Sequence, residues 1–402
     1  MTTKKKIILF QQYLRKPTLS LVEHLKGFDY IHQNPFSQKS FYQALPQDFS
    51  TEVKRSKNGL VNSIRRALGI LNFRFKFDNG DCLFLSYGCF LITNRPYCIY
   101  IENGLALFNF DYKLAMNPIS KILFTFFVKN DHLKYLIFMS ETAKKSFFST
   151  LSINKSIKSI LDKKSIIVPP ILTKNTTEPK IFSGKLKLLF VGLFYMKGGL
   201  QLINAFENLL KKYSNVHLTI VTPVNLINQR DLSRIKNNSN ITLFDAVLQK
   251  EEMDSLYKNN DIFVLPTFRD SSPLVLLEAV TWGMPIIAND QYAVRDVAHH
   301  NFNALLFDNH PLKDYDPVTM CHLGKYRHPK DFYHDLFKAH QDGLLKVVEI
   351  FLEESIEKFL LNQKLLETFS KNSLYTYDTQ FESTMLLNKT ESIFQSAFEK
   401  RR

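Results

Sequence analysis

Short apolar runs alternate with amphipathic stretches through the second half of the chain. The stretch from Leu200 to Leu209, for example, places its apolar residues on one helical face. Runs of this length, bounded by polar or turn residues, predict buried strands of a parallel sheet. The strands expected in this half are Leu186–Val191, His217–Val221, Asn240–Phe244, Ile262–Leu265 and Ile286–Ala288. Strands that alternate with helices indicate an α/β domain.

The first half contains a second set of such runs. The expected strands are Ile7–Phe10, Asp81–Leu85, Tyr97–Ile101, Tyr135–Ser140 and Ile166–Pro170. Residues 173–185 are polar and lack periodicity, so we interpret them as a linker. The pattern therefore predicts a first domain over 1–172 and a second over 186–380, with further helices over 344–369 and 381–398.

Composition fits a globular protein with more than one domain. The chain has 402 residues, 45% of them hydrophobic, and its longest apolar candidate, Ile122–Val128, is only strand-sized. No run is long enough to span a bilayer and no signal peptide precedes the first strand, so we expect a cytoplasmic protein. The four cysteines have no metal-ligand spacing and indicate reduced thiols.

The net charge is +14, from 52 Lys and Arg against 38 Asp and Glu. Such a charge suits acidic substrates, an anionic membrane surface or nucleic acid, but no RNA-binding motif or zinc finger appears, so nucleic acid is not expected. The basic amphipathic stretch 54–71 is compatible with contact at the inner face of the plasma membrane and also with an ordinary surface helix. The His-rich segment 308–340 lacks metal-ligand spacing and is predicted to be a solvated insertion.

Candidate chemistry concentrates in the segment from Asp261 to Pro285. A strand is followed by a polar loop and by a helix that Ser272 would cap, with Pro273 as its first residue. Amides at a helix N-terminus bind phosphate, and two carboxylates eight residues apart, Asp270 and Glu278, suit the hydroxyls of a nucleotide-linked polyol. An ordinary βαβ unit with a solvated Asp explains the same spacing.

The loop after Val191 is a second candidate. Gly192, Lys197 and Gly198 lie between a buried strand and a helix, which is the layout of a phosphate site. Neither the dinucleotide-binding glycine pattern nor a Walker A sequence is present. A solvated loop lysine is the alternative interpretation of Lys197.

Both candidate segments resemble glycosyltransferase family 4, whose members are retaining enzymes of the GT-B fold. The family pattern Pro-Ser-x-x-Glu, then Glu-Ala and Gly-x-Pro, is matched by Pro266–Asp270, Glu278-Ala279 and Gly283–Pro285. The Phe-Val-Gly…Lys-Gly motif is matched by residues 190–198. Asp270 stands where the family usually has Glu, and Leu193 stands where it often has Arg.

The resemblance implies two Rossmann-like α/β domains facing across a cleft, with the last helix, about 381–402, packed back on the first domain. It implies catalytic roles for Lys197 on the diphosphate, Asp270 on the donor sugar and Glu278 on the ribose, without a metal or other cofactor. The acceptor side would carry Glu102 and Asn103, which a simple turn also explains. The remaining donor contacts would come from Gly192, Gly198, Asp245, Val247, Ser271, Ser272, Pro273 and Leu274.

The implied activity is transfer of a sugar from a UDP- or GDP-sugar to a hydroxyl of a glycan or lipid-linked acceptor. Surface polysaccharide or lipopolysaccharide assembly is the commonest setting of such enzymes. Two other hypotheses keep the same fold: a sugar-nucleotide epimerase, and a non-catalytic partner protein.

Overall fold

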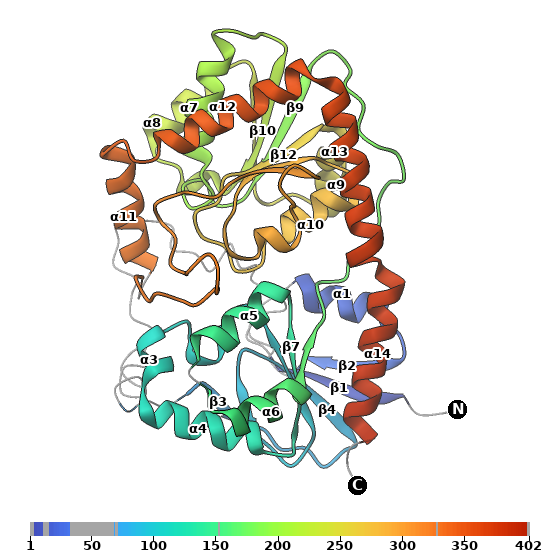
Figure 1. The fold of residues 1–402 in the computed structure, drawn as a ribbon. Coiled ribbons are helices and arrows are strands. Elements are labelled where there is room, and N and C mark those ends of the chain that lie inside the picture. Colours follow the sequence, from blue (N-terminus) through green and yellow to red (C-terminus); the bar gives the residue numbers. More distant parts are fainter. Residues whose placement is uncertain are drawn as a thin grey trace.

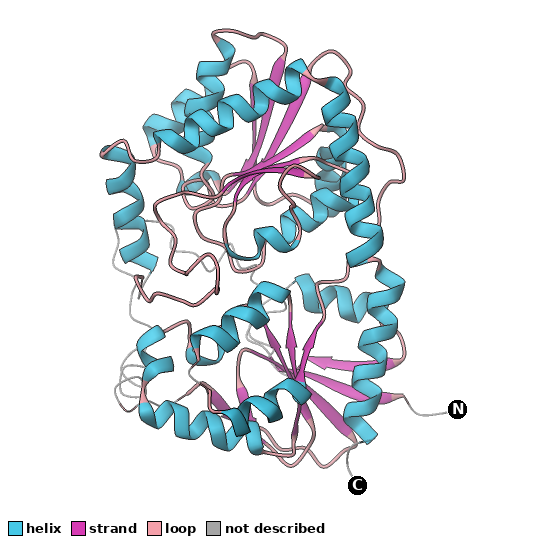
Figure 2. Cartoon of the chain, viewed as in Figure 1, coloured by secondary structure: helices cyan, strands magenta, loops and turns pink. Residues whose placement is uncertain are grey.

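The computed structural model describes residues 4–10, 16–32, 68, 71–151, 153–326 and 329–399. Two six-stranded parallel sheets lie one above the other, each covered by helices on both faces (Figures 1 and 2). The first has the order β2-β1-β4-β6-β7-β8 and the second β11-β10-β9-β12-β13-β14, while β3 and β5 form a small separate pair. The prediction of two α/β sheets is confirmed.

The strands of the two sheets are short and largely buried. The first half of the chain contributes β1 Lys5–Phe10, β2 Phe28–His32, β3 Phe73–Phe75, β4 Cys82–Tyr87, β5 Phe90–Ile92, β6 Tyr97–Ile101, β7 Leu133–Phe138 and β8 Ser165–Ile167. The second half contributes β9 Leu186–Val191, β10 Val216–Thr222, β11 Ile241–Asp245, β12 Ile262–Leu265, β13 Ile286–Asn289 and β14 Ala304–Phe307. Helices on both faces of a parallel sheet explain why its central strands are mostly apolar.

The helices fall into two groups along the chain. Those of the first half are α1 Lys16–His24, α3 Tyr112–Met116, α4 Pro118–Lys129, α5 Glu141–Thr150 and α6 Lys155–Lys164. Those of the second half are α7 Gly199–Leu210, α8 Gln229–Lys236, α9 Lys250–Asn259, α10 Leu274–Thr281, α11 Pro329–Gln341, α12 Lys346–Leu361, α13 Gln363–Thr376 and α14 Ser383–Glu399.

The last helix lies on the first sheet. Leu386 and Phe394 of α14 share a buried cluster with Ile7 of β1 and Leu83 of β4. Between α13 and α14 the segment Tyr377–Phe381 forms a π-helical turn, where the chain passes from one half of the molecule to the other (Figure 1). No strand or helix occurs in residues 173–185, all of which are described.

The apolar run Ile122–Val128, which has the length of a strand, lies inside helix α4. The signal that it is helical precedes the run: the Asn117 side chain accepts hydrogen bonds from the amides of Ile119 and Ser120, and Pro118 follows at the first helical position.

One predicted helix start is also wrong. Helix α10 begins at Leu274, two residues after the expected cap, and no side chain caps it. The amide of Ser272 instead donates to Asp270 Oδ1 at 3.2 Å, an Asx turn that delays the helix. Further along the chain, Tyr292–Asp296 forms a short 3-10 turn, η4.

Segment 308–340 is not a solvated insertion. Tyr315 and Met320 pack with Tyr292 in a small buried cluster, and Phe332 belongs to the core of the second domain. His310 and His322 are buried as well. Aromatic and aliphatic residues spaced irregularly between the polar ones supply this burial, which periodicity alone does not reveal.

The amphipathic stretch 54–71 lies outside the described residues except for Leu68 and Leu71. Most of the loop after β1 also lies outside them. Among the described helices, none combines the length and apolar character needed to cross a membrane.

Candidate functional site

The loop after β9 is shaped by two glycines with positive φ. At Gly192, φ is +149°, and a Cβ there would lie 2.8 Å from Lys197 Cγ, so the glycine makes room for the lysine stem. At Gly198, φ is +77°, and a Cβ would lie 2.3 Å from the carbonyl oxygen of Pro266, just after β12. The two loops at the carboxyl edge of β9 and β12 therefore touch through backbone that only glycine allows.

This contact brings two of the predicted catalytic residues together. Lys197 Nζ forms an ion pair with Asp270 Oδ2 and donates to the carbonyl oxygen of Arg269 at 3.1 Å. The side chains are only 15% and 12% exposed. A cation and an anion are thus held at the carboxyl edge of the second sheet, the edge at which parallel α/β sheets bind ligands.

Helix α10 points its N-terminus into a pocket of about 390 Å³ between the two domains. Ser272, Pro273 and Leu274 line it from the second domain, and Ser140 and Glu141 line it from the first. Helix α10 has no side-chain cap, and the amides of Leu274 and Leu276 donate to the carbonyl oxygens of Ser272 and Pro273, at 2.9 and 3.0 Å. The adjoining Ser271 is half-buried.

Glu278 lies one turn further along α10 and is held by a neighbour. Tyr257 of α9 donates from its hydroxyl to Glu278 Oε2 at 2.8 Å, and the Tyr257 ring stacks on Phe263 of β12 at 5.8 Å. Asp245 ends β11 and accepts from the amide of Ala246 at 2.8 Å, and Val247 next to it is exposed. These residues lie along the carboxyl edge of the second sheet, in the order in which its strands are arranged.

On the first domain, Glu102 and Asn103 are buried at the carboxyl end of β6. Glu102 Oε2 accepts from the Tyr87 hydroxyl at 2.7 Å, and Asn103 Oδ1 accepts from the amide of Leu105 at 2.8 Å. The next residue, Gly104, donates its amide to the hydroxyl of Tyr292 in the second domain at 3.3 Å. The predicted acceptor-side turn therefore contacts the second domain directly.

Tyr292 has φ of +47°, a conformation uncommon for a residue other than glycine. Its ring is buried, its amide donates to the Tyr315 hydroxyl at 2.8 Å, and burial raises the pKa of its own hydroxyl. Tertiary contacts on both sides hold the residue in this conformation.

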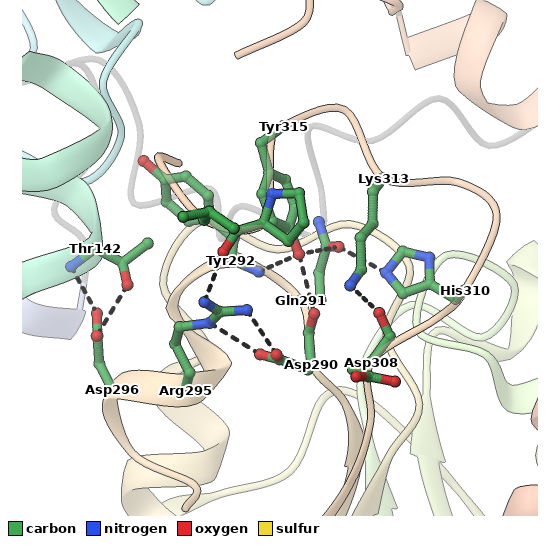
Figure 3. A network of polar contacts seen from close by, with 12 residues as sticks. Thr142, Asp290, Gln291, Tyr292, Arg295, Asp296, Asp308, His310, Lys313 and Tyr315 are labelled. Carbon is green, nitrogen blue, oxygen red and sulfur yellow. Dashed lines mark hydrogen bonds and ion pairs between the residues drawn. The ribbon is translucent and has the colours of Figure 1, made fainter. Parts of the chain in front are cut away.

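A second connection between the domains lies four residues on. Asp296 accepts from the amide and the hydroxyl of Thr142, at 3.0 and 2.9 Å, at the start of α5 (Figure 3). Burial raises the pKa of Asp296. Nearby, Arg295 binds both carboxylate oxygens of Asp290, at 3.0 and 2.6 Å, and the carbonyl oxygen of Pro317 at 2.9 Å. The network ties η4 to α5 on one side and to the 308–326 segment on the other (Figure 3).

Arg269 and two histidines are buried behind the donor-side loop. The Arg269 guanidinium lies 5.5 Å from the Phe332 ring centre, and its Nη1 has no hydrogen-bond partner. Burial lowers the pKa of His310 to about 3 and of His322 to about 4, so both are neutral at pH 7. Among the described residues, no group of three or more His, Cys, Asp or Glu could hold a metal ion.

Several neighbours of the predicted site residues were missed from the sequence. Tyr257 and Tyr292 contact the predicted residues from distant elements, and no local motif marks them. Asp296 likewise lies outside the motifs that the sequence matched.

The comparisons with known proteins agree with this arrangement. Residues 173–315 match the family described as "Glycosyl transferases group 1". The chain is 23% identical over 318 residues to the capsular polysaccharide biosynthesis glycosyltransferase CapM of Staphylococcus aureus, covering 76% of this chain and 72% of that protein.

Two solved structures have similar folds. Anabaena HepE in complex with UDP and glucose matches with a TM-score of 0.59 and 12% identity, over 98% of this chain and all of HepE (100%). WaaG, a glycosyltransferase involved in lipopolysaccharide biosynthesis, matches with a TM-score of 0.55 and 14% identity, over 96% of this chain and 99% of WaaG. At these identities the likeness concerns the fold, which confirms the prediction of GT-B.

With the family motifs lying at the carboxyl edge of the second sheet of this fold, residues 173–315 carry the domain of the group 1 glycosyltransferases, enzymes that use nucleotide sugars, within a chain of the GT-B fold.

Proposed function

We propose that this enzyme transfers a sugar from a UDP- or GDP-sugar to a hydroxyl of a glycan or lipid-linked acceptor, with retention at the anomeric carbon. The observation that carries the proposal is the largely buried Lys197–Asp270 pair beside the N-terminus of α10. A diphosphate in this place would meet a cation and the positive end of the helix dipole, and a sugar beyond it would meet a carboxylate.

The role of Lys197 in this proposal is electrostatic. When the bond between the sugar and the diphosphate breaks, negative charge grows on the leaving phosphate, and a fixed ammonium stabilises it. In the free enzyme this ammonium is neutralised by Asp270. Donor binding would therefore exchange one partner for another: the diphosphate takes over Lys197, and Asp270 turns to the sugar hydroxyls.

Unpartnered buried atoms support a ligand at the same edge. Thr222 Oγ1 at the end of β10 and Asn289 Oδ1 at the end of β13 are buried without a hydrogen-bond partner, although Asn289 Nδ2 donates to the carbonyls of Pro266 and Thr267. Buried polar atoms are normally satisfied, and exceptions are typical of functional sites. Glu278, held by Tyr257, would take the ribose hydroxyls.

Retention in the proposal needs no protein nucleophile. The leaving phosphate would accept the proton of the acceptor hydroxyl on the same face of the sugar, and no metal is required. CapM and WaaG act in capsular polysaccharide and lipopolysaccharide biosynthesis, respectively. We infer a comparable cell-surface polysaccharide for the acceptor of this enzyme, and hence work on the cytoplasmic side of the membrane.

The test is isothermal titration of the purified enzyme with UDP and with GDP. One nucleotide should bind, and Lys197→Ala should weaken binding about tenfold or more, since a charge-assisted hydrogen bond contributes roughly 1.5–3 kcal/mol. Lys211→Ala, which removes an exposed lysine of the same domain, should leave binding unchanged. Glu278→Ala should also weaken binding, and its control is Glu354→Ala on the exposed side of α12.

Absence of binding to either nucleotide by a folded enzyme would contradict the proposed donor. The stereochemistry is read separately, from the anomeric proton couplings of the first-formed product in NMR spectra. An inverted product would refute retention while leaving the donor site in place.

A further inference from the structure

The pocket between the two domains has a mostly apolar wall. Of the 18 described residues that line it, 12 are aliphatic, aromatic, methionine or proline. Among these are Met139 and Ile167 of the first domain, Leu277 of α10, and Phe381 and Met385 at the start of the last helix. Phe381 supplies the one aromatic ring of the 18. The wall therefore suits an aliphatic group better than a planar ring, which prefers aromatic neighbours.

Two of the polar residues that line the pocket already have partners within the protein. Ser140 Oγ accepts from the amide of Ala143 at 3.0 Å and caps α5. Asp296 accepts from the amide and the hydroxyl of Thr142, at 3.0 and 2.9 Å. A sugar buried against such a wall would leave several hydroxyls without hydrogen-bond partners, and each of them has a desolvation cost. A glycan therefore fits this pocket poorly.

The exposed lining residues form the rim of the pocket. Three of them, Gln380, Met385 and Lys389, belong to the π-helical turn and α14, and Glu141 belongs to α5. The rim thus carries one cation and one anion, which together favour neither sign of charge on a ligand. Burial of apolar surface is then the main attraction that the pocket offers.

The pocket adjoins the predicted donor site. Ser272, Pro273 and Leu274 line it and follow Asp270, whose carboxylate pairs with Lys197. A chain that fills the pocket would hold its polar head close to this pair. The volume of about 390 Å³ has room for a chain on the order of ten carbons, at about the 30 Å³ that a water molecule takes in the liquid.

We propose that this pocket binds the aliphatic chain of the acceptor, which makes the acceptor an amphiphile with a hydroxyl-bearing head rather than a free glycan. The inference rests on the proposed function, because it names the class of acceptor for the same reaction. The chain and the nucleotide contact different walls of the cleft, so their binding can be measured separately.

The experiment uses methionine methyl groups as probes, since Met139 and Met385 are two of the eight methionines in the sequence and both line the pocket. NMR spectra of the whole enzyme with ¹³C-labelled methionine methyls are recorded while hexyl or octyl β-glucoside is added below its micelle concentration. The signals of these two residues, assigned from Met→Leu variants, should shift, whereas those of Met116 and Met253 should not. Methyl β-glucoside should shift none of them. Affinity should rise about fourfold for each added CH₂ group, because the chain is buried.

A substitution at the rim tests the same contact. Met385→Asp should weaken binding of octyl β-glucoside about tenfold, because the chain would desolvate a carboxylate. Val347→Asp on α12 is the matched control, since Val347 is 48% exposed against 45% for Met385 and does not line the pocket. Thermal unfolding shows that each variant is folded, and nucleotide titration without amphiphile tests the donor site separately.

The proposal is overturned if octyl β-glucoside shifts neither pocket methionine, or if it shifts all methionine signals alike, as a nonspecific detergent would. It is also overturned if methyl β-glucoside binds as tightly as octyl β-glucoside, since the head alone would then supply the affinity. Displacement of octyl β-glucoside by UDP or GDP would overturn it too, because the pocket would then belong to the nucleotide. Binding of the chain without binding of either nucleotide would support the pocket and refute the donor site alone.

Discussion

Replacing Gly198 by Ala tests whether the contact between the two loops builds the donor site. An alanine Cβ at this position would lie 2.3 Å from the Pro266 carbonyl oxygen and 2.9 Å from Pro266 Cγ. Real Cβ atoms stay about 1 Å further from a carbonyl oxygen, so the β9–α7 and β12–α10 loops must separate. That movement would pull Lys197 away from Asp270 and from the N-terminal end of α10.

Gly343 is a matched control. Its φ is +72°, close to the +77° of Gly198, but a Cβ there would have nothing within 4 Å. Gly343→Ala therefore carries the backbone strain alone, about 1 kcal/mol, part of which is offset by the stiffer unfolded chain. Gly198→Ala combines the same backbone strain with the steric overlap, and overpacking of this kind lowers the free energy of unfolding by about 1–3 kcal/mol more.

The assay is thermal unfolding together with nucleotide titration. Gly198→Ala should melt lower than Gly343→Ala by roughly 2–4 °C for each additional kcal/mol. It should also bind nucleotide about tenfold more weakly, whereas Gly343→Ala should bind normally. Equal melting temperatures for the two variants, or unchanged nucleotide affinity in Gly198→Ala, would refute the reasoning.

Two further predictions concern buried polar groups. Tyr257→Phe removes the hydrogen bond to Glu278 but keeps the ring stack, so the affinity for UDP or GDP should fall about fivefold, near 1 kcal/mol. The affinity for the matching 2′-deoxynucleotide should fall less, and an equal loss for the two nucleotides would contradict a ribose contact. The pKa of His322 is about 4 in the folded protein and 6.5 for a free histidine, so on acidification the unfolded state binds a proton before the folded state does. Stability therefore falls as the pH drops from 6.5 towards 4, and at pH 5 the free energy of unfolding is about 2 kcal/mol lower than at pH 7. In urea unfolding, His322→Gln should lack this part of the pH dependence, and a pH profile identical to that of the unmodified enzyme would exclude a buried neutral His322.

The second sheet could be predicted because its strands are apolar on both faces. Leu186–Val191 and Ile262–Leu265 were found at their observed bounds, since burial under helices on both sides leaves little room for polar residues. In the first domain, β2, β3 and β5 were missed. Phe28–His32 and Phe73–Phe75 contain charged residues and carry partly exposed side chains, which weaken the apolar signal.

Local motifs predicted the donor-side residues but not the geometry around them. The spacing of Asp270 and Glu278 is a property of one short segment, so the sequence contains it. The ion pair of Asp270 with Lys197 joins residues 73 positions apart, and it depends on the backbone contact at Gly198. The late start of α10 depends on the Asp270 side chain competing for the amide of Ser272, a choice that propensity does not decide.

Tyr292 shows why the acceptor side was harder still. Glycine is the usual residue where φ is positive, so a tyrosine at this position predicts a backbone turn without positive φ. The structure keeps the turn, because strain of about 1 kcal/mol is offset by contacts that the local sequence does not contain. The tyrosine hydroxyl receives the amide of Gly104 from the other domain, and the tyrosine amide reaches Tyr315.

These contacts also define what opening the molecule would require. Helix α5 is held at its start by Asp296 through Thr142 and at its end by the amide of His322 through Thr150 Oγ1 at 3.0 Å. The turn after β6 is held by Tyr292. All three ties join the same region of the first domain to η4 and the 308–326 segment, so a rotation that separates the domains must break them together. Each is a hydrogen bond at a buried or partly buried site, so breaking all three has a larger cost than breaking one, and the residues that form them lie outside the motifs predicted to bind the donor.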